Sequence, residues 1–253
     1  MDKWTGKIAL VTGATSGIGR DLSLRLVEHG MKVIGCGRNV ENLKNLKNEI
    51  PKNAKGEFFP FECDIMKEED ILKMFDFIET NFKSLHLLIN NAGLCLEGSI
   101  LQSKTENWNI MFQTNVLGLS ICTREAFKLL KKNETTDEVP GHIINISSLC
   151  GHEVISEKFT HFYCASKFAV TAITEGIRQE LREIHSKIRV TQISPGLVAT
   201  EFVKRAFGEE IEKRMSPMLD KALKPCDITS AIIYVLSAEA RNNVHDILLR
   251  PTN

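Results

Sequence analysis

The sequence has no excess of charge of either sign, and this absence removes two broad classes of protein. Its 253 residues carry 32 Lys+Arg and 32 Asp+Glu, for a formal net charge of +0. General nucleic-acid and membrane-surface binders depend on a basic excess. We therefore expect no nucleic-acid partner, although a local basic pocket is compatible with this composition.

The sequence also lacks a cysteine pattern for metal binding or disulfides. None of its cysteines forms a pair with the two-residue spacing of zinc and redox motifs. An odd number of cysteines in a long chain argues against a disulfide framework, so we expect buried or incidental thiols in a reducing compartment and no metal site. The cysteines lie at positions 36, 63, 95, 122, 150, 164 and 226.

Long apolar runs and a targeting segment are missing as well. No apolar run approaches the ~20 residues needed to cross a bilayer. The N-terminus has no signal-peptide core and is expected to lead straight into a short strand. These absences predict a cytoplasmic protein without a membrane span. The hydrophobic content of 43% is enough for a sizeable core.

Strand and helix patterns alternate along the whole chain. Short apolar runs typical of buried parallel strands occur at 8–11, 33–34, 58–61, 87–89, 142–146, 188–193 and 245–249. Helical spacing predicts helices over 18–29, 67–80, 106–131, 161–184 and 227–237, a further helix capped by Asn39, and a surface loop from Lys131 to Glu138. This alternation predicts one α/β domain over residues 1–253, a doubly wound parallel sheet of about seven strands with helices on both faces.

Glycine and polar clusters follow several of these strands and should meet at the carboxyl edge of the sheet. The turn Gly13-x-x-x-Gly17-x-Gly19 places glycines where backbone must approach a phosphate, and it aims a helix N-terminus at that anion. It differs from the dinucleotide fingerprint that has two glycines first. A tight strand–helix turn without a ligand is the alternative.

The residue after the second strand bears on cofactor choice. NAD sites usually carry a carboxylate there, whereas this chain has Arg38, whose guanidinium can pair with a 2′-phosphate. This predicts NADP(H), with Ser16 and Arg20 near enough in sequence to assist; a solvent-facing arginine is the alternative. Asp64 could accept from the adenine amino group or could cap a helix.

A tyrosine and a lysine are spaced for proton transfer. Tyr163 and Lys167 are four residues apart and share a helix face, and an ammonium beside a phenol favours phenolate. The pair Ser147-Ser148 lies upstream. Asn115 falls in the middle of a predicted helix, where asparagine is a mediocre former. It is expected to kink that helix through a bound water, or to be exposed and idle.

Together these motifs resemble the short-chain dehydrogenase/reductase family over nearly the whole chain. The resemblance rests on Thr12 to Gly19, Asn90 to Gly93, Asn115, Asn145 to Ser148, Tyr163 with Lys167, and Pro195-Gly196. It implies a Rossmann-type fold, a homodimer or homotetramer, and hydride transfer between nicotinamide and a carbinol carbon without a metal. It implies the catalytic tetrad Asn115, Ser148, Tyr163 and Lys167.

The resemblance also implies a role for each site residue. Ser148 would donate to the substrate oxygen and Tyr163 would exchange its proton, while Lys167 would lower the tyrosine pKa and bind the nicotinamide ribose. Asn115 would hold a water that links Lys167 to solvent, and Ser147 would wall the cofactor pocket. The implied NADP(H) contacts are Gly13, Thr15, Ser16, Gly17, Ile18, Gly19, Arg38, Asn39, Asp64, Ile65, Asn91, Ala92, Gly93, Tyr163, Lys167, Pro195, Gly196, Val198 and Thr200.

A narrower resemblance concerns the substrate. Thr160 to Tyr163, Thr174 to Glu180 and Ile193 to Gly196 resemble the family-member-eleven type of dehydrogenase/reductase, which includes farnesol dehydrogenase-like enzymes and reductases of steroid 17- and 3-ketones. This implies a small hydrophobic alcohol or carbonyl substrate, with a farnesol-type alcohol ahead of ketosteroids and other carbonyls. The somewhat long stretch between Ser148 and Tyr163 is expected to shape the substrate entrance, with His152 and His161 at its surface rather than in the chemistry.

Residues 198–224 are expected to form a substrate lid. Apolar side chains in this segment can line a pocket, and methionines adapt to irregular shapes; packing of half of them on the core is the alternative. They are Phe202, Val203, Ala206, Phe207, Ile211, Met215, Met218 and Leu219. Two other functions fit the sequence less well. A non-catalytic NADP(H) sensor would have no need of the four reactive residues, and a nucleotide-sugar epimerase usually has a larger substrate domain.

Overall fold

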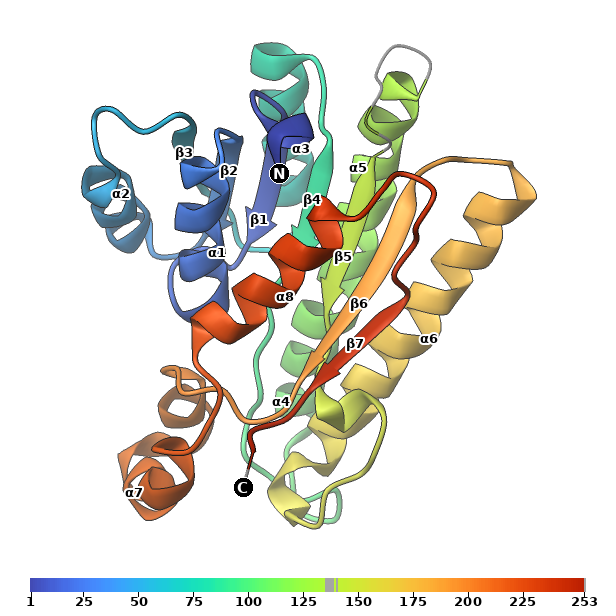
Figure 1. Ribbon diagram of the computed structural model, residues 1–253. Coiled ribbons are helices and arrows are strands. Elements are labelled where there is room, and N and C mark those ends of the chain that lie inside the picture. Colours follow the sequence, from blue (N-terminus) through green and yellow to red (C-terminus); the bar gives the residue numbers. More distant parts are fainter. Residues whose placement is uncertain (135–138, 140, 253) are drawn as a thin grey trace.

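One parallel sheet forms the centre of the protein, as predicted. The computed structural model describes residues 1–134, 139 and 141–252. In that part of the chain, seven strands pair in the order β3-β2-β1-β4-β5-β6-β7 (Figure 1). The strands are β1 (Ile8–Thr12), β2 (Lys32–Gly37), β3 (Glu57–Glu62), β4 (Leu87–Asn90), β5 (His142–Ile146), β6 (Arg189–Pro195) and β7 (Asp246–Leu249).

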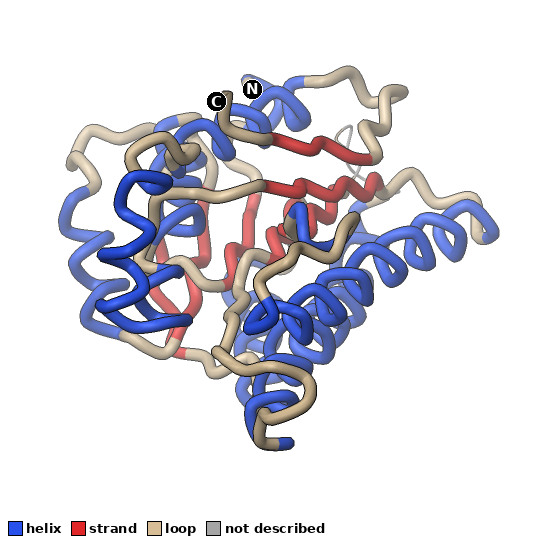
Figure 2. Tube along the Cα trace, turned by 90° about the horizontal axis from the view of Figure 1, so that it is seen from below, coloured by secondary structure: helices blue, strands red, loops and turns tan. Residues whose placement is uncertain are grey.

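Helices cover both faces of this sheet (Figure 2). Helices α1 (Gly17–Glu28), α2 (Val40–Glu49) and α8 (Pro225–Ser237) pack on one face around Leu22, Leu43 and Ile232. Helices α3 (Glu68–Phe82), α5 (Leu119–Asn133) and α6 (His161–Glu183) pack on the other. Because β1, β4 and β5 are buried on both faces, their side chains are apolar almost without interruption. The doubly wound fold is confirmed.

The predicted helix over 106–131 is not continuous. The chain forms α4 (Thr105–Phe112), a π-helical segment (Gln113–Gly118) and then α5. The wide turn contains Asn115, which is 1% exposed and bonded to neighbouring elements. π-Bulges of this kind occur often at functional sites. The helix therefore changes its winding where the sequence has its one anomalous asparagine.

The prediction for the N-terminus was incomplete. A short 3-10 turn (Asp2–Trp4) precedes β1, and Trp4 is fully buried, with its indole Nε1 donating to the Leu236 carbonyl at 2.8 Å. The predicted loop from Lys131 to Glu138 begins too early, because α5 continues to Asn133. Residues 135–138 lie outside the described part of the chain.

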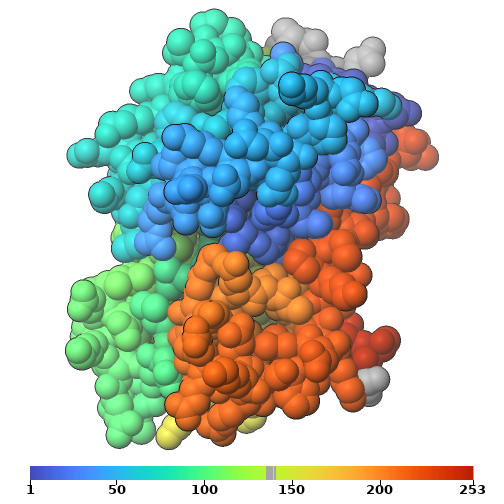
Figure 3. Space-filling view, turned by 90° about the vertical axis from the view of Figure 1, so that its left-hand side faces the viewer, coloured from blue at the N-terminus to red at the C-terminus, as the bar shows by residue number. Residues whose placement is uncertain are grey.

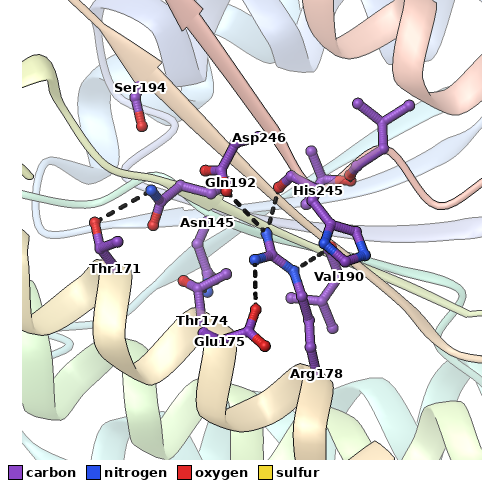
Figure 4. Close-up of polar contacts among 12 residues, drawn as sticks. Asn145, Thr171, Thr174, Glu175, Arg178, Val190, Gln192, Ser194, His245 and Asp246 are labelled. Carbon is purple, nitrogen blue, oxygen red and sulfur yellow. Dashed lines mark hydrogen bonds and ion pairs between the residues drawn. The ribbon is translucent and has the colours of Figure 1, made fainter. Parts of the chain in front are cut away.

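A buried arginine fastens the last strand to the sheet (Figure 4). Arg178 on α6 is 7% exposed and donates from Nε to the Val190 carbonyl at 3.2 Å. Its Nη2 donates to the His245 carbonyl and lies 3.6 Å from an Asp246 carboxylate oxygen. The guanidinium thus joins α6, β6 and the start of β7 at the edge of the sheet.

The segment between β6 and α8 contains a helix that weak periodicity did not predict. Helix α7 (Phe202–Leu219) bends at Gly208, which has φ 80° and ψ 173°. It lies beyond the carboxyl ends of the strands, below the N-terminal half of the molecule in the face that Figure 3 shows. Within the described residues, no helix is long and apolar enough to span a membrane.

Candidate active site

The glycine turn between β1 and α1 is shaped by two left-handed glycines. Gly13 and Gly17 have φ of +67° and +56°, which other L residues rarely adopt. A Cβ on Gly19 would lie 2.3 Å from the Gly13 carbonyl oxygen, so this position accepts glycine only. Thr15 and Ser16 lie half-buried on the turn, and Ser16 precedes α1 without capping it through its side chain among the described residues. The turn therefore presents backbone amides and a positive helix end to an anion.

An asparagine directly after β4 holds this turn, and sequence reasoning missed that role. Asn91 Nδ2 donates to the carbonyls of Thr12 at 2.9 Å and Gly13 at 3.1 Å. Thr12 Oγ1 accepts in return from the amides of Asn91 and Ala92, both at 3.0 Å. The family resemblance implies that Asn91 is an NADP(H) contact. In the structure its side-chain amide is used by the turn, and the Ala92 backbone lies beside Gly13.

The end of β6 reaches the same place from the other half of the sheet. β6 continues through Pro195, two residues beyond the predicted strand over 188–193, and the Gly196 amide donates to the Leu249 carbonyl at 2.7 Å. A Cβ on Gly17 would lie 3.1 Å from Thr200 Cγ2, and Val198 pairs with Leu223. The predicted contacts on both sides of the sheet's switch point are therefore neighbours in space.

The part of the site that is predicted to bind adenosine contains an exposed guanidinium, that of Arg38. Arg38 is exposed directly after β2, and no ion pair of its guanidinium occurs among the described residues. Asn39 caps α2 as predicted, because its side chain accepts from the Asn42 amide at 3.0 Å. Arg20, which had been expected to assist Arg38, forms an ion pair with Glu49 instead.

Asp64 and Ile65 form the turn after β3. Asp64 Oδ1 accepts from the Met66 amide at 3.1 Å, and the Asp64 amide donates to Asp70 at 3.3 Å. The aspartate thus stabilises the turn before α3, but it does not cap that helix, because the N-cap position belongs to Lys67. Ile65 is 8% exposed and packs on the core beside Gly118 of the π-helical segment.

The catalytic candidates meet where β5 and α6 come together. Ser148 follows β5, and its Oγ accepts from the Cys150 amide at 3.1 Å. A side-chain hydrogen bond joins Ser148 to Tyr163. Lys167, 4% exposed, has its Nζ 5.7 Å from the centre of the Tyr163 ring and donates to the Ile146 carbonyl at 2.9 Å. A phenol, a hydroxyl and an amine therefore face one small space.

The electrostatics of this group differ from the prediction that Lys167 lowers the tyrosine pKa. Burial raises the pKa of Tyr163 well above its usual range, although the hydrogen bond with Ser148 opposes this shift. Burial also lowers the pKa of Lys167 from 10.5 to about 8. Both side chains are thus pushed toward their neutral forms, because desolvation disfavours either charge. The i, i+4 spacing predicts that Lys167 lies beside Tyr163. It does not predict the burial, whose effect on the tyrosine pKa is larger.

Asn115 connects the loop after β4 with α6. Its Oδ1 accepts from the Leu94 amide at 2.8 Å, and its Nδ2 donates to the Leu94 carbonyl at 2.8 Å and to Ser166 Oγ at 3.0 Å. A Cβ on Gly93 would lie 3.3 Å from Asn115 Oδ1 and 3.5 Å from Lys167 Nζ. The asparagine side chain thus lies near Lys167, and the idle, exposed alternative is wrong.

Ser147 and His152 connect the segment after β5 to α6 and β6. Ser147, 4% exposed, donates to the Lys167 carbonyl at 3.5 Å and is directed toward α6. His152 Nε2 lies 2.8 Å from Ser194 Oγ and 3.3 Å from Gln192 Nε2 on β6. These bonds tie the loop after Ser148 to β6, so His152 has a structural partner.

Aromatic side chains gather around Tyr163. The Phe202 ring of α7 lies 5.8 Å from the Tyr163 ring, and Phe159 and Phe207 meet edge to face at 4.9 Å. Trp108 stacks on Phe162 at 5.1 Å. Of the expected lid residues, Val203 and Ala206 are buried, whereas Met218 is 60% exposed and does not line the site in this structure. Phe202 thus brings an apolar ring from α7 to the phenol, and the two other ring pairs join α4 to α6 and the turn before α6 to α7.

The fold and the site together indicate the class of protein to which this chain belongs. The sequence profile of the short chain dehydrogenase family matches residues 7–210. The chain belongs to this family and is an oxidoreductase whose fold binds a nicotinamide cofactor.

Individual proteins within and around this family are similar to nearly the whole chain. The chain is 46% identical to dehydrogenase/reductase SDR family member 11 of Homo sapiens, covering 100% of this chain and 96% of that protein. It is 40% identical to farnesol dehydrogenase of Aedes aegypti, covering 99% and 98%. Among solved structures, the closed form of serine dehydrogenase complexed with NADP+ matches with a TM-score of 0.85 and 31% identity, covering 96% of this chain and 94% of the other. The predicted resemblance is confirmed.

Proposed function

We propose that this protein is an NADP(H)-dependent oxidoreductase that interconverts a hydrophobic alcohol and its carbonyl, with a farnesol-type isoprenoid alcohol as substrate. The aromatic surroundings of Tyr163 carry the proposal, because Phe202 lies against the reacting phenol itself. Apolar walls with few polar groups are typical of sites for apolar ligands. The similarity to a farnesol dehydrogenase supports the isoprenoid class.

The cofactor would lie across the carboxyl edge of the sheet. The left-handed glycines Gly13 and Gly17 and the helix end behind them fit a pyrophosphate, since any Cβ at Gly19 would fill the turn. The exposed guanidinium of Arg38 fits a 2′-phosphate, and planar guanidinium is well suited to bidentate phosphate binding. When bound, the nicotinamide would supply or accept the hydride.

The chain's own groups would move the proton. Ser148 would hydrogen-bond the substrate oxygen and hold it near Tyr163, with which it already shares a hydrogen bond. Tyr163 would give its proton to that oxygen in reduction and take it back in oxidation. Lys167 would stabilise the phenolate when the tyrosine loses its proton, and Asn115 lies beside the lysine to connect it with solvent. The raised pKa of Tyr163 keeps its phenol protonated, which is the form that would donate a proton in reduction.

The segment 198–224 would act as the lid of the pocket. The bend at Gly208 separates the part of α7 that carries Phe202 and Phe207 from its exposed second half. The contact between Phe159 and Phe207 joins the lid to the loop before α6. Closure of this segment over the substrate would exclude water from the reacting atoms.

A substrate panel tests the proposal. With NADP+, we expect oxidation of farnesol and other long apolar alcohols, and none of serine. Phe202→Ala is expected to weaken kcat/KM for apolar substrates by about 10-fold or more through lost apolar contact. Met218→Ala, at an exposed lid position, is the matched control. Equal activity of both variants, or no turnover of any long apolar alcohol or carbonyl, would refute the pocket.

Cofactor preference is tested separately. Arg38→Ala is expected to reduce the preference for NADP(H) over NAD(H) by about 10-fold or more, since it removes a charge-assisted pair. Arg20→Ala is the control, because Arg20 is engaged with Glu49. An unchanged preference in Arg38→Ala would place 2′-phosphate recognition elsewhere.

We also propose self-association through the edge of the sheet. β7 is an edge strand, and Leu248 on it and Tyr234 on α8 are 44% and 63% exposed. Exposed apolar edge strands are normally covered. Sedimentation velocity of the protein and of a Leu248→Lys variant measures this; an unchanged sedimentation coefficient would count against this surface.

A further inference from the structure

Two buried cysteines flank the catalytic pair. Cys150 follows Ser148 by two residues and is 7% exposed, and Cys164 directly follows Tyr163 and is 0% exposed. No part of the proposed reaction uses either thiol. Both nevertheless occupy segments whose position decides the geometry of catalysis.

Independent contacts bring these segments together. The 3-10 turn Leu149–Gly151 packs on α6, where Thr171 Oγ1 donates to the Gly151 carbonyl at 3.1 Å. A Cβ on Gly151 would lie 2.9 Å from the Lys167 carbonyl oxygen. Positions 164, 167 and 171 lie on one face of a helix. Cys164 therefore faces the turn that contains Cys150, and each thiol is near enough to shift the pKa of the other.

We propose that Cys150 and Cys164 are a redox modification site, which peroxide converts to a disulfide that switches off the adjacent active site. The proposal rests on the proposed function only for its activity readout. The disulfide itself is independent of substrate and cofactor.

The chemistry balances with one hydrogen peroxide. The Cys164 thiolate attacks a peroxide oxygen, the O–O bond breaks, and hydroxide leaves to take up a proton, forming a sulfenic acid and water. Cys150 sulfur then attacks the sulfenic sulfur, the S–O bond breaks, and the Cys150 proton leaves with it as a second water. Two thiols are oxidised and one peroxide is reduced. The proximity of the thiols favours this order, because Cys150 lowers the pKa of Cys164, whereas Cys164 and burial raise the pKa of Cys150.

The bond would disturb the catalytic groups directly. A disulfide holds its sulfurs about 2.05 Å apart, closer than any hydrogen-bonded thiol pair. Closing that gap moves the turn after Ser148 relative to the α6 residue beside Tyr163. A displacement of about 1 Å in a reacting group can reduce turnover about 100-fold.

Peptide mapping tests the site. After peroxide treatment, blocking of remaining thiols and trypsin digestion, we expect a disulfide between peptides 133–158 and 159–167, which contain Cys150 and Cys164. Cys63 likewise raises the pKa of Cys36, and these two thiols serve as an internal comparison. Their disulfide would join peptides 33–38 and 56–67. A disulfide only there, or none at peroxide levels that inactivate the protein, would overturn the proposal.

Activity gives the second readout. Peroxide is expected to lower wild-type turnover at least 10-fold, with recovery in dithiothreitol, whereas Cys150→Ser and Cys164→Ser resist this reversible loss. Cys226→Ser, at the exposed cysteine, is expected to respond as wild type. Equal inactivation of all variants would overturn the switch. If no substrate is turned over, the proposed function fails, and the peptide map still decides the disulfide.

Discussion

Lys167 has a proposed role in catalysis, but its burial lowers the stability of the folded protein. Burial at 4% exposure lowers its pKa from 10.5 to about 8. The difference, 10.5 − 8, corresponds to about 3 kcal/mol against folding at neutral pH, at about 1.4 kcal/mol for each unit. Lys167→Met removes this penalty. It also removes the hydrogen bond to the Ile146 carbonyl, which is worth about 1–3 kcal/mol.

The pH dependence separates these two contributions. Between pH 8 and 10.5 the unfolded chain binds more protons at this lysine than the folded protein does, so the penalty is full below this window and absent above it. We expect Lys167→Met to be as stable as wild type or up to about 2 kcal/mol more stable at pH 7. This advantage is expected to shrink by about 2 kcal/mol by pH 10, while the variant loses most of its turnover.

Urea unfolding at several pH values measures this difference, with the buried indole of Trp4 as a fluorescent reporter. Lys213→Met, at an exposed position, controls for the change of side chain. A difference between Lys167→Met and wild type that stays constant or grows with pH would refute the reasoning. Retained turnover in Lys167→Met would refute the catalytic role.

Three further predictions concern single contacts. Tyr163→Phe keeps the ring contact with Phe202 but is expected to lower turnover about 10²–10⁴-fold while NADPH still binds in a fluorescence titration; near-normal turnover would contradict the assignment. Asn91→Ala removes two hydrogen bonds that hold the glycine turn. It is expected to lower the unfolding free energy by about 1–3 kcal/mol and to weaken NADPH binding. An unchanged thermal midpoint would show that the turn does not need these bonds. Arg178→Met is expected to destabilise the protein by about 3–5 kcal/mol and to speed hydrogen exchange in β7 first; exchange that rises elsewhere instead would argue against its role at the edge.

The sheet could be predicted because its signals are local. Each central strand is a short apolar run ending in a polar or glycine cluster, and burial on both faces explains that pattern. The edges were harder. The end of β6 looked like a turn because of Ser194-Pro195, yet Pro195 lies at the end of a strand where the ladder loses little by its missing amide.

The site was predicted as a set of residues but not as a set of contacts. Spacing placed Tyr163 and Lys167 on one face, whereas the balance between their charges depends on burial that no spacing expresses. The function of Asn91 in holding Gly13 depends on two strands that are far apart in the sequence. The π-helical turn at Asn115 likewise depends on Leu94 and Ser166, which lie on other elements.

The buried Trp4 has a consequence for how the chain is made. Its indole is held by the Leu236 carbonyl on α8, and the Lys3 ammonium donates to the Ala238 carbonyl nearby. Trp4 and Lys3 therefore lack these partners until Leu236 and Ala238 have left the ribosome. Until then the tryptophan is an exposed apolar group on a nascent chain, which is the kind of surface that chaperones retain. The contact between Trp4 and α8 is thus made late in the synthesis of the described chain.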